Sequence, residues 1–150
     1  MSTVAYDGVY LAVDSQISDQ EGTAKSQINK LWRWKRGYFT VTGALEDFPI
    51  CKAILEGKKN LRLSKESEGI YTDDGKVFIL FRNGMTVEIQ PPHAIGTGDN
   101  VALALMKAGH SAEEAIKFTC EVDLYSSLPV NYVIVKPTER SGTVAKNTID

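Results

Sequence analysis

The chain has 150 residues, the length of a single domain. About 43% of them are hydrophobic, which is enough to bury a core without help from metals or disulfides. The formal net charge of −2 gives no overall attraction to nucleic acid or to a membrane surface. The longest apolar runs, Val77–Phe81 and Val101–Met106, are far too short to span a bilayer, and no signal peptide opens the chain. We therefore expect a cytoplasmic protein that binds neither nucleic acid nor membrane.

The sequence carries no pattern typical of a metal or cofactor site. Cys51 and Cys120 have no second cysteine or histidine at ligand spacing, so we expect both to be buried small residues in a reducing compartment; one reactive thiol is the alternative. His93 and His110 lie far apart, and there is no Gly-x-Ser-x-Gly, P-loop or dinucleotide motif. We predict no cofactor and no metal.

Two strand pairs are predicted in the first 42 residues, each around a two-residue turn that ends in glycine. They are Thr3–Tyr6 with Val9–Val13 around Asp7-Gly8, and Ile28–Trp34 with Tyr38–Thr42 around Arg36-Gly37. Trp32 and Trp34 lie on one face of their strand. They are more typical of a core or a subunit interface than of a platform for stacking bases.

A helix is predicted from Asp47, because Pro49 is tolerated in a first turn and Gly57 is a suitable stop. Its apolar residues fall on one face. They are Ile50, Cys51, Ile54 and Leu55. The charged segment Lys58–Gly69 is predicted to be a surface connection.

Two more strands follow in the second half of the chain, separated by Asn83-Gly84. Val77–Phe81 is continuously apolar, as expected for a strand buried on both faces. In the second strand, Met85–Ile89, apolar and polar residues alternate, which is typical of one buried face.

The last elements are two helices and a strand. The first helix runs from Asp99 through Ala108. A capping box, Ser111–Glu114, opens the second helix, which continues to about Val122. The final strand is Val130–Val135.

Strands in runs, with helices grouped between them, indicate an α+β fold in which two antiparallel sheets lie face to face and helices cover the outside. We predict a single domain over residues 1–136 and a polar tail over 137–150.

Six short motifs, in order and at compatible spacings, resemble those of proteasome β-subunits and the bacterial peptidase HslV. They are Ser2–Tyr6, Leu11–Ser15, Lys30 sixteen residues after Asp14, Thr40–Gly43, Ile95–Gly98 and Asp123–Ser126. The resemblance implies a four-layer αββα sandwich and a homo-oligomer built as a ring or double ring. It also implies a peptide or unfolded protein as substrate, with an ATPase unfoldase as a possible partner. Compact members from tailed phages are similar in size, so the cytoplasm would be that of a bacterium or of a phage-infected cell.

In this family the nucleophile is the hydroxyl of the first residue, and the α-amine of that residue helps to move the proton. An α-amine has a pKa of about 7.7–8.0, close to working pH, so it is a suitable base for a hydroxyl that is otherwise a poor nucleophile. Here Met1 precedes Ser2. The resemblance therefore implies removal of Met1 and catalysis by Ser2.

The other site residues are also carried over from the resemblance. Lys30 would be the cation beside the nucleophile and Asp14 its carboxylate partner, the alternatives being a solvated lysine and a turn or cap residue. Asp123 and Ser126 would orient the terminal amine, and Thr97 would replace a family serine near it. The alternatives are a helix-end residue for Asp123 and an N-cap for Thr97.

Two departures from the family pattern leave two functions open. Ser2 replaces threonine and loses the methyl group that restricts χ1. Thr40 aligns with the glycine whose backbone N–H supplies the oxyanion hole, and losing one such donor lowers the rate by about 10²–10³-fold. The sequence thus supports a serine-type N-terminal-nucleophile peptidase or a catalytically degenerate relative with a structural or binding role.

Overall fold

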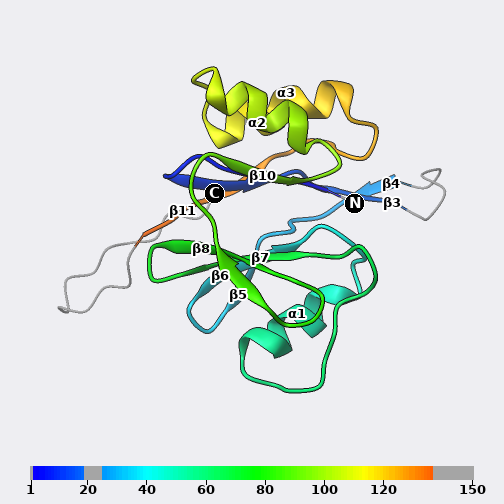
Figure 1. The fold of residues 1–150 in the computed structure, drawn as a ribbon. Coiled ribbons are helices and arrows are strands. Elements are labelled where there is room, and N and C mark those ends of the chain that lie inside the picture. The colour runs from blue at the N-terminus through cyan, green and yellow to red at the C-terminus, as the bar shows by residue number, and fades with distance from the viewer. Residues whose placement is uncertain (1, 19–24, 137–150) are drawn as a thin grey trace.

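The fold, taken from a computed structural model, has four layers in the order helix, sheet, sheet, helix (Figure 1). The structure describes residues 2–18 and 25–136. Two helices, α2 (Asp99–Lys107) and α3 (Ala112–Val122), form one outer layer, and α1 (Asp47–Leu55) forms the other. The predicted tail over 137–150 lies outside the described residues.

Both central sheets are antiparallel throughout. The four-stranded sheet has the order β10-β1-β2-β11 and lies under α2 and α3. Its strands are His93–Gly96, Thr3–Tyr6, Tyr10–Val13 and Asn131–Ile134. The five-stranded sheet has the order β5-β6-β7-β8-β9 and carries α1 on its outer face. Its strands are Trp32–Trp34, Gly37–Val41, Gly69–Asp73, Lys76–Leu80 and Thr86–Glu88.

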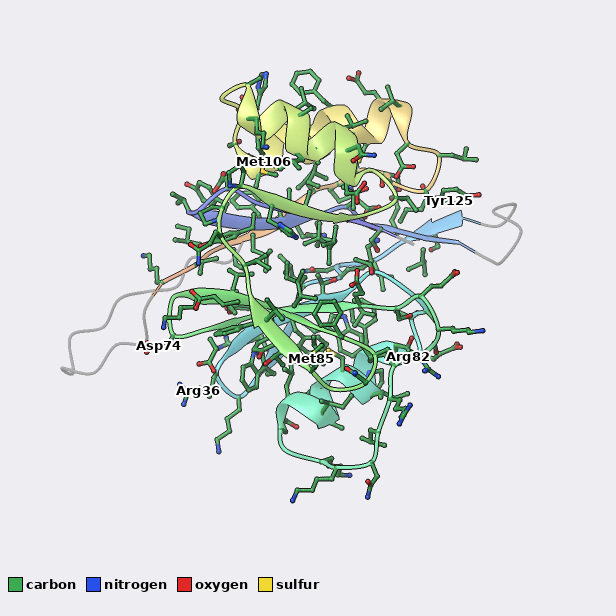
Figure 2. All side chains as sticks on the ribbon, viewed as in Figure 1. Arg36, Asp74, Arg82, Met85, Met106 and Tyr125 are labelled. Carbon is green, nitrogen blue, oxygen red and sulfur yellow. The ribbon has the colours of Figure 1, made fainter. Side chains whose placement is uncertain are left out.

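Three apolar clusters hold the four layers together, and side chains fill the spaces between them (Figure 2). The cluster between the sheets includes Val4, Leu11 and Ile79. A second cluster, rich in alanine, joins the four-stranded sheet to α2 and α3. The third joins the five-stranded sheet to α1. The predicted α+β sandwich of two antiparallel sheets between helical layers is confirmed.

Strand β8 is buried on both faces, as its continuous apolar run predicts. Val77 and Ile79 belong to the cluster between the sheets, whereas Phe78 and Leu80 pack toward α1. The two tryptophans of β5 also lie in the cluster under α1, where Trp32 contacts the ring of Phe48. Trp34 is a buried core residue, and Trp32 is half-buried against the same cluster.

The segment predicted as one long strand, Ile28–Trp34, is a strand only over Trp32–Trp34. The prediction is wrong for the first four residues because Ile28 donates its N–H to Ser15 O, which draws this part of the chain out of the β5–β6 ladder. A short two-stranded ribbon, β3 (Gln16–Ser18) with β4 (Lys25–Gln27), was not predicted. Its residues are mostly polar and have no clear alternation.

Two predictions about exposure are also wrong. Lys58–Gly69 is not only a surface connection, because Leu63 and Ser67 are buried and Gly69 already begins β7. In the segment Met85–Ile89 only Ile89 is buried, since β9 is the edge strand of its sheet; Met85 is 56% exposed and Val87 46%.

Within the part of the chain that the structure describes, no helix is both long and apolar enough to cross a membrane.

Candidate active site

Lys30 lies at the centre of a buried polar site between the two sheets. Its side chain is 2% exposed. Its Nζ donates to Ser2 Oγ at 2.8 Å, to Asp14 Oδ1 at 2.9 Å and to the carbonyl oxygen of Gln16 at 2.8 Å. All three protons of the ammonium group therefore have an acceptor. The interpretation of Lys30 as a solvated strand lysine is wrong.

The carboxylate of Asp14 is fully buried and accepts four hydrogen bonds. Lys30 Nζ and the N–H of Thr3, at 3.1 Å, donate to Oδ1. The N–H groups of Gln16 and Ser127 donate to Oδ2, at 3.0 and 3.1 Å. A carboxylate with this many donors is held in one orientation. Asp14 is a buried partner of Lys30, and it also accepts from the N–H of Gln16 two residues on, as a turn residue does.

Burial lowers the pKa of Lys30 from its ordinary value, and the nearby Asp14 carboxylate opposes that effect. A lysine in this environment is a cation whose proton is less tightly held than in water. It lies 2.8 Å from the Ser2 hydroxyl, where it can stabilise negative charge on Oγ.

A second polar cluster lies beneath α2 and α3, around the hydroxyl of Thr3. Thr3 Oγ1 is 2.8 Å from Ser126 Oγ and 3.4 Å from Asp123 Oδ2. The same carboxylate oxygen of Asp123 accepts from Ser126 Oγ at 2.5 Å and from Thr97 Oγ1 at 2.6 Å. The N–H of Gly98 donates to Thr3 Oγ1 at 2.9 Å.

Three of the expected site residues, Asp123, Ser126 and Thr97, meet in this second cluster. Asp123 and Ser126 contact the side chain of Thr3, and Asp123 is also the C-cap residue of α3. Thr97 is not the N-cap of α2, because Gly98 occupies that position and Thr97 donates its hydroxyl proton to Asp123.

Thr97 also fixes the main chain of the candidate nucleophile, since its N–H donates to Ser2 O at 2.9 Å. The preceding Gly96 has φ +102°, and a Cβ at this position would lie 1.8 Å from Ser2 O. Only glycine permits this close approach of the two strands.

Thr40 is the one expected site residue whose side chain makes no hydrogen bond to the other six. It pairs with Ile70 in the β6–β7 ladder, and its Oγ1 is buried without a partner among the described residues. Two residues further along the chain, just after β6, Thr42 donates its N–H to the carbonyl oxygen of Glu68, just before β7. Because hydrogen-bonded pairs recur every second residue in an antiparallel ladder, the N–H of Thr40 is also directed at β7. This direction does not favour an oxyanion-hole role for Thr40.

Sequence reasoning missed Thr3 and Gln16. The alternation along β1 could have indicated Thr3: Val4 and Tyr6 face the five-stranded sheet, so Ala5 and Thr3 face the helices. Gln16 contributes through a backbone carbonyl, which any residue type could supply, so no sequence signal exists for it.

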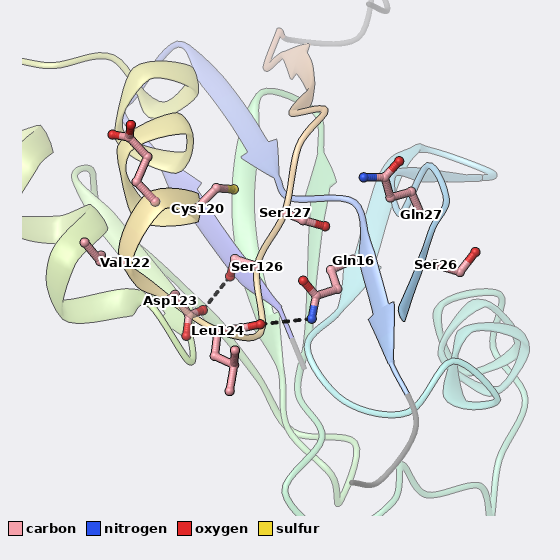
Figure 3. Close-up of a pocket in the computed structure, with 10 residues that line it drawn as sticks. Gln16, Ser26, Gln27, Cys120, Val122, Asp123, Leu124, Ser126 and Ser127 are labelled. Atoms are coloured by element: carbon pink, nitrogen blue, oxygen red, sulfur yellow. Dashed lines mark hydrogen bonds between the residues drawn. The ribbon is translucent and has the colours of Figure 1, made fainter. Parts of the chain in front are cut away.

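A pocket of about 740 Å³ opens beside the second cluster (Figure 3). Asp123 and Ser126 line it on one side and Gln27 on the other. Gln16 lies between them and donates its side-chain amide proton to Leu124 O at 3.1 Å. Gln16 thus links the pocket to the Lys30 site.

Cysteine and metal chemistry gain no support at this site. Cys51 is fully buried and Cys120 is partly buried at the pocket. Burial raises the pKa of each thiol to about 12, so both are protonated and unreactive near neutral pH. Among residues 2–18 and 25–136, no group of three or more histidine, cysteine or acidic residues is placed to hold a metal ion.

No protein-family model matches the chain, and no curated protein matches its sequence. Solved structures do match its fold. Thiobacillus denitrificans BPH is 16% identical with a TM-score of 0.71, and the match covers 93% of this chain and 99% of BPH. Thiobacillus denitrificans BPH in complex with Epoxomicin is 17% identical with a TM-score of 0.69, covering 92% of this chain and 99% of the other.

Eukaryotic HslV from Trypanosoma brucei is 19% identical with a TM-score of 0.65, and the match covers 90% of this chain and 98% of HslV. Identities this low establish similarity of fold. The chain therefore adopts the four-layer αββα fold of proteasome-like N-terminal-nucleophile hydrolases.

Proposed function

We propose that this chain is the subunit of a proteasome-like or HslV-like peptidase in which Ser2 becomes the N-terminal nucleophile after Met1 is removed. The observation that carries the proposal is the contact of 2.8 Å between Lys30 Nζ and Ser2 Oγ, inside a site where Asp14 holds the lysine. A buried cation bonded to a hydroxyl in this way favours the alkoxide form of that hydroxyl.

In the proposed reaction Ser2 Oγ attacks the peptide carbonyl, and the proton of the hydroxyl passes to the free α-amine of Ser2. The protonated amine then donates this proton to the leaving amine as the C–N bond breaks, which leaves an ester on Ser2. Water hydrolyses the ester, with the amine again acting as base, and regenerates the hydroxyl. Lys30 stabilises negative charge on Oγ throughout, and Asp14 keeps the lysine in place.

The remaining expected residues have supporting roles in this proposal. Asp123, Ser126 and Thr97 form one hydrogen-bonded group next to the first strand. From there they can bind and orient the α-amine once Met1 is gone. Thr40 is left without a catalytic role, because its N–H is directed into the ladder.

By analogy with the named structures of the same fold, we propose a ring or double ring of identical subunits that acts on peptides or unfolded proteins, with an ATPase unfoldase as a candidate partner. A catalytically degenerate subunit with a structural or binding role is the second candidate. The observation that favours it is the lack of an available oxyanion donor at Thr40.

Intact mass spectrometry and active-site labelling test the proposal. The purified protein should be one methionine lighter than the translated chain. It should also form an adduct on Ser2 with an epoxyketone such as Epoxomicin, the compound bound in the similar BPH structure. This ring-closing reaction needs both the hydroxyl and the free amine. Ser2→Ala should abolish the adduct, whereas the control Ser111→Ala, at the half-buried N-cap of α3, should retain it.

Retention of Met1 together with no adduct would refute the peptidase. The amine would then be displaced by one residue and the base would be missing. The second candidate function, a catalytically degenerate subunit with a structural or binding role, would then replace the peptidase proposal.

A further inference from the structure

We infer that Thr3 is a positioning residue for the proposed nucleophile. Its hydroxyl binds the first strand to the residues around α2 and α3. This contact keeps the neighbouring Ser2 in the orientation in which its Oγ faces Lys30. This inference rests on the proposed function of Ser2. It adds a residue that has no part in the chemistry itself.

Ser2 and Thr3 point to opposite faces of the four-stranded sheet. Ser2 Oγ reaches Lys30 between the sheets, while Thr3 Oγ1 reaches Ser126 beneath the helices. Successive side chains of an extended chain alternate in this way. A hydrogen bond that fixes the side chain of Thr3 on one face therefore restricts rotation of the neighbouring Ser2 on the other face.

The hydrogen bonds around Thr3 have a defined direction. Ser126 uses its single hydroxyl proton for Asp123 Oδ2, at 2.5 Å. Thr3 must then donate to Ser126, because the contact of 2.8 Å between their hydroxyl oxygens needs one donor. Gly98 donates its N–H to the other side of Thr3 Oγ1. Thr3 therefore accepts one hydrogen bond and donates another in a chain that ends at the Asp123 carboxylate. A carboxylate at the end of such a chain strengthens the hydrogen bonds that lead to it.

The backbone around Thr3 is shaped for this contact. A Cβ on Gly98 would lie 2.5 Å from Thr3 Oγ1 and 2.2 Å from Thr119 Cγ2, so only glycine lets the start of α2 approach so closely. The main chain is also held on both sides of the Ser2–Thr3 peptide. Ser2 O accepts from Thr97 N–H, and Thr3 N–H donates to Asp14 Oδ1. Asp14 therefore binds both Lys30 and the strand that carries Ser2.

The experiment compares Thr3→Val, which keeps the shape and removes the hydroxyl, with Thr3→Ser, which keeps the hydroxyl. The matched control is Thr119→Val, because Thr119 is an equally buried threonine whose hydroxyl donates to Ala115 O within its own helix α3. The full-length processed protein is labelled with Epoxomicin. The maximal labelling rate is measured separately from the concentration that gives half of that rate.

We expect Thr3→Val to lower the maximal labelling rate by about 10- to 100-fold with little change in the half-saturating concentration, because a misplaced nucleophile affects the reaction step and not the binding step. Thr3→Ser should label within about threefold of the wild type, and so should Thr119→Val. A merely structural role for Thr3 would give Thr3→Val and Thr119→Val the same behaviour, and this result would overturn the inference.

A second measurement separates this inference from the proposed function. Amide hydrogen exchange at Thr97, whose N–H binds Ser2 O, should be at least about 10-fold faster in Thr3→Val than in the wild type or in Thr3→Ser. If the wild type does not react with Epoxomicin but this exchange accelerates as expected, the peptidase fails and the anchoring role of Thr3 stands. Unchanged exchange at Thr97 overturns the anchoring role whatever the reactivity of Ser2.

Discussion

At the scale of single residues, Lys30 illustrates how a charge is kept inside this protein. Moving an ammonium group out of water is unfavourable by several kcal/mol, and one carboxylate seldom offsets all of it. Lys30 also donates to a hydroxyl and a backbone carbonyl, so its desolvation is opposed by three hydrogen bonds. A buried pair of this kind contributes little to stability compared with apolar residues. Its position against Ser2 Oγ is the basis of the chemical role proposed above.

Replacing Lys30 by alanine should impair both the reactivity and the stability of the protein. The Asp14 carboxylate would remain buried without its counter-charge, which lowers the free energy of unfolding by about 3–5 kcal/mol. Labelling of Ser2 by an epoxyketone should be lost. The exposed Lys107 offers a matched control, since Lys107→Ala should change neither quantity. Urea unfolding and intact mass measure the two effects, and a variant with wild-type stability and labelling would place the site elsewhere.

The same comparison has a pH dependence whose sign follows from the pKa of Lys30. Burial lowers this pKa below the ordinary value of 10.5, so as pH rises the folded protein releases the Lys30 proton before the unfolded chain does. Stability rises with pH wherever the unfolded state binds more protons. The contribution of Lys30 to the free energy of unfolding should therefore rise between its lowered pKa and 10.5, and this increment should be absent in Lys30→Ala.

The sequence predicts part of this site. Asp14 follows the end of β2 and Lys30 precedes β5, and the two side chains form an ion pair of 2.9 Å; the resemblance led us to expect this pairing from the spacing of the two residues. The contact of Asp123 and Ser126 with the Thr3 hydroxyl depends on how the loop after α3 packs beneath the sheet. The direction of the Thr40 N–H depends on the β6–β7 register. Neither the loop packing nor the register is encoded in a local motif.

At the scale of secondary-structure elements, Asp7 joins a turn to a helix. Its Oδ1 accepts from the N–H groups of Val9 and Tyr10, at 2.8 and 2.7 Å, and closes the first hairpin. Its Oδ2 accepts from the N–H of Ala112, the first residue of α3, at 2.7 Å. A carboxylate at a helix N-terminus is also favoured by the helix dipole. This side chain therefore couples the β1–β2 hairpin to the helix above it.

Asp7→Ala should lower the free energy of unfolding by about 2 kcal/mol, because three backbone donors lose an ionised acceptor. Asp73→Ala is the control: Asp73 accepts from Arg36 at the surface, and solvent screens an exposed ion pair of this kind so that it contributes little to stability. Urea unfolding of both variants measures the difference. If Asp7→Ala lowers the free energy of unfolding no more than Asp73→Ala does, the hydrogen bonds from Asp7 to the hairpin and to α3 do not stabilise the fold.

Elements with strong local signals were predictable from the sequence, and those defined by tertiary contacts were not. The capping box of α3 is present as predicted, with Ser111 and Glu114 each bonding the other's backbone N–H. The continuous apolar run of β8 correctly predicted that this strand is buried on both faces. The alternation of Met85–Ile89 was misleading, because an edge strand leaves Met85 and Val87 without a covering layer. The β3–β4 ribbon has neither an apolar face nor a described turn that would indicate it.

At the scale of the whole molecule, the outer surface of α3 carries large apolar side chains that no layer formed by residues 2–18 and 25–136 covers. Phe118 and Val122 lie one helical turn apart on one face and are 46% and 70% exposed. Leu124, just after the helix, is 62% exposed. Neighbouring exposed apolar residues of this size are typical of surfaces that bind another protein. In the proposed ring, a second copy of the chain would cover them.

The assembly itself is the last prediction. Light scattering at micromolar concentration should give a mass several times the 16.5 kDa of one chain. Val122→Glu should shift the population toward smaller species, because it places a charge in a contact that excludes water. Val87→Glu is the matched control: Val87 is 46% exposed, but it lies on the edge strand β9 at a distance from α3 in the fold, and its substitution should leave the mass unchanged. A wild-type protein that is monomeric under these conditions would contradict the ring. Equal dissociation by both variants would mean that the α3 surface is not the specific contact.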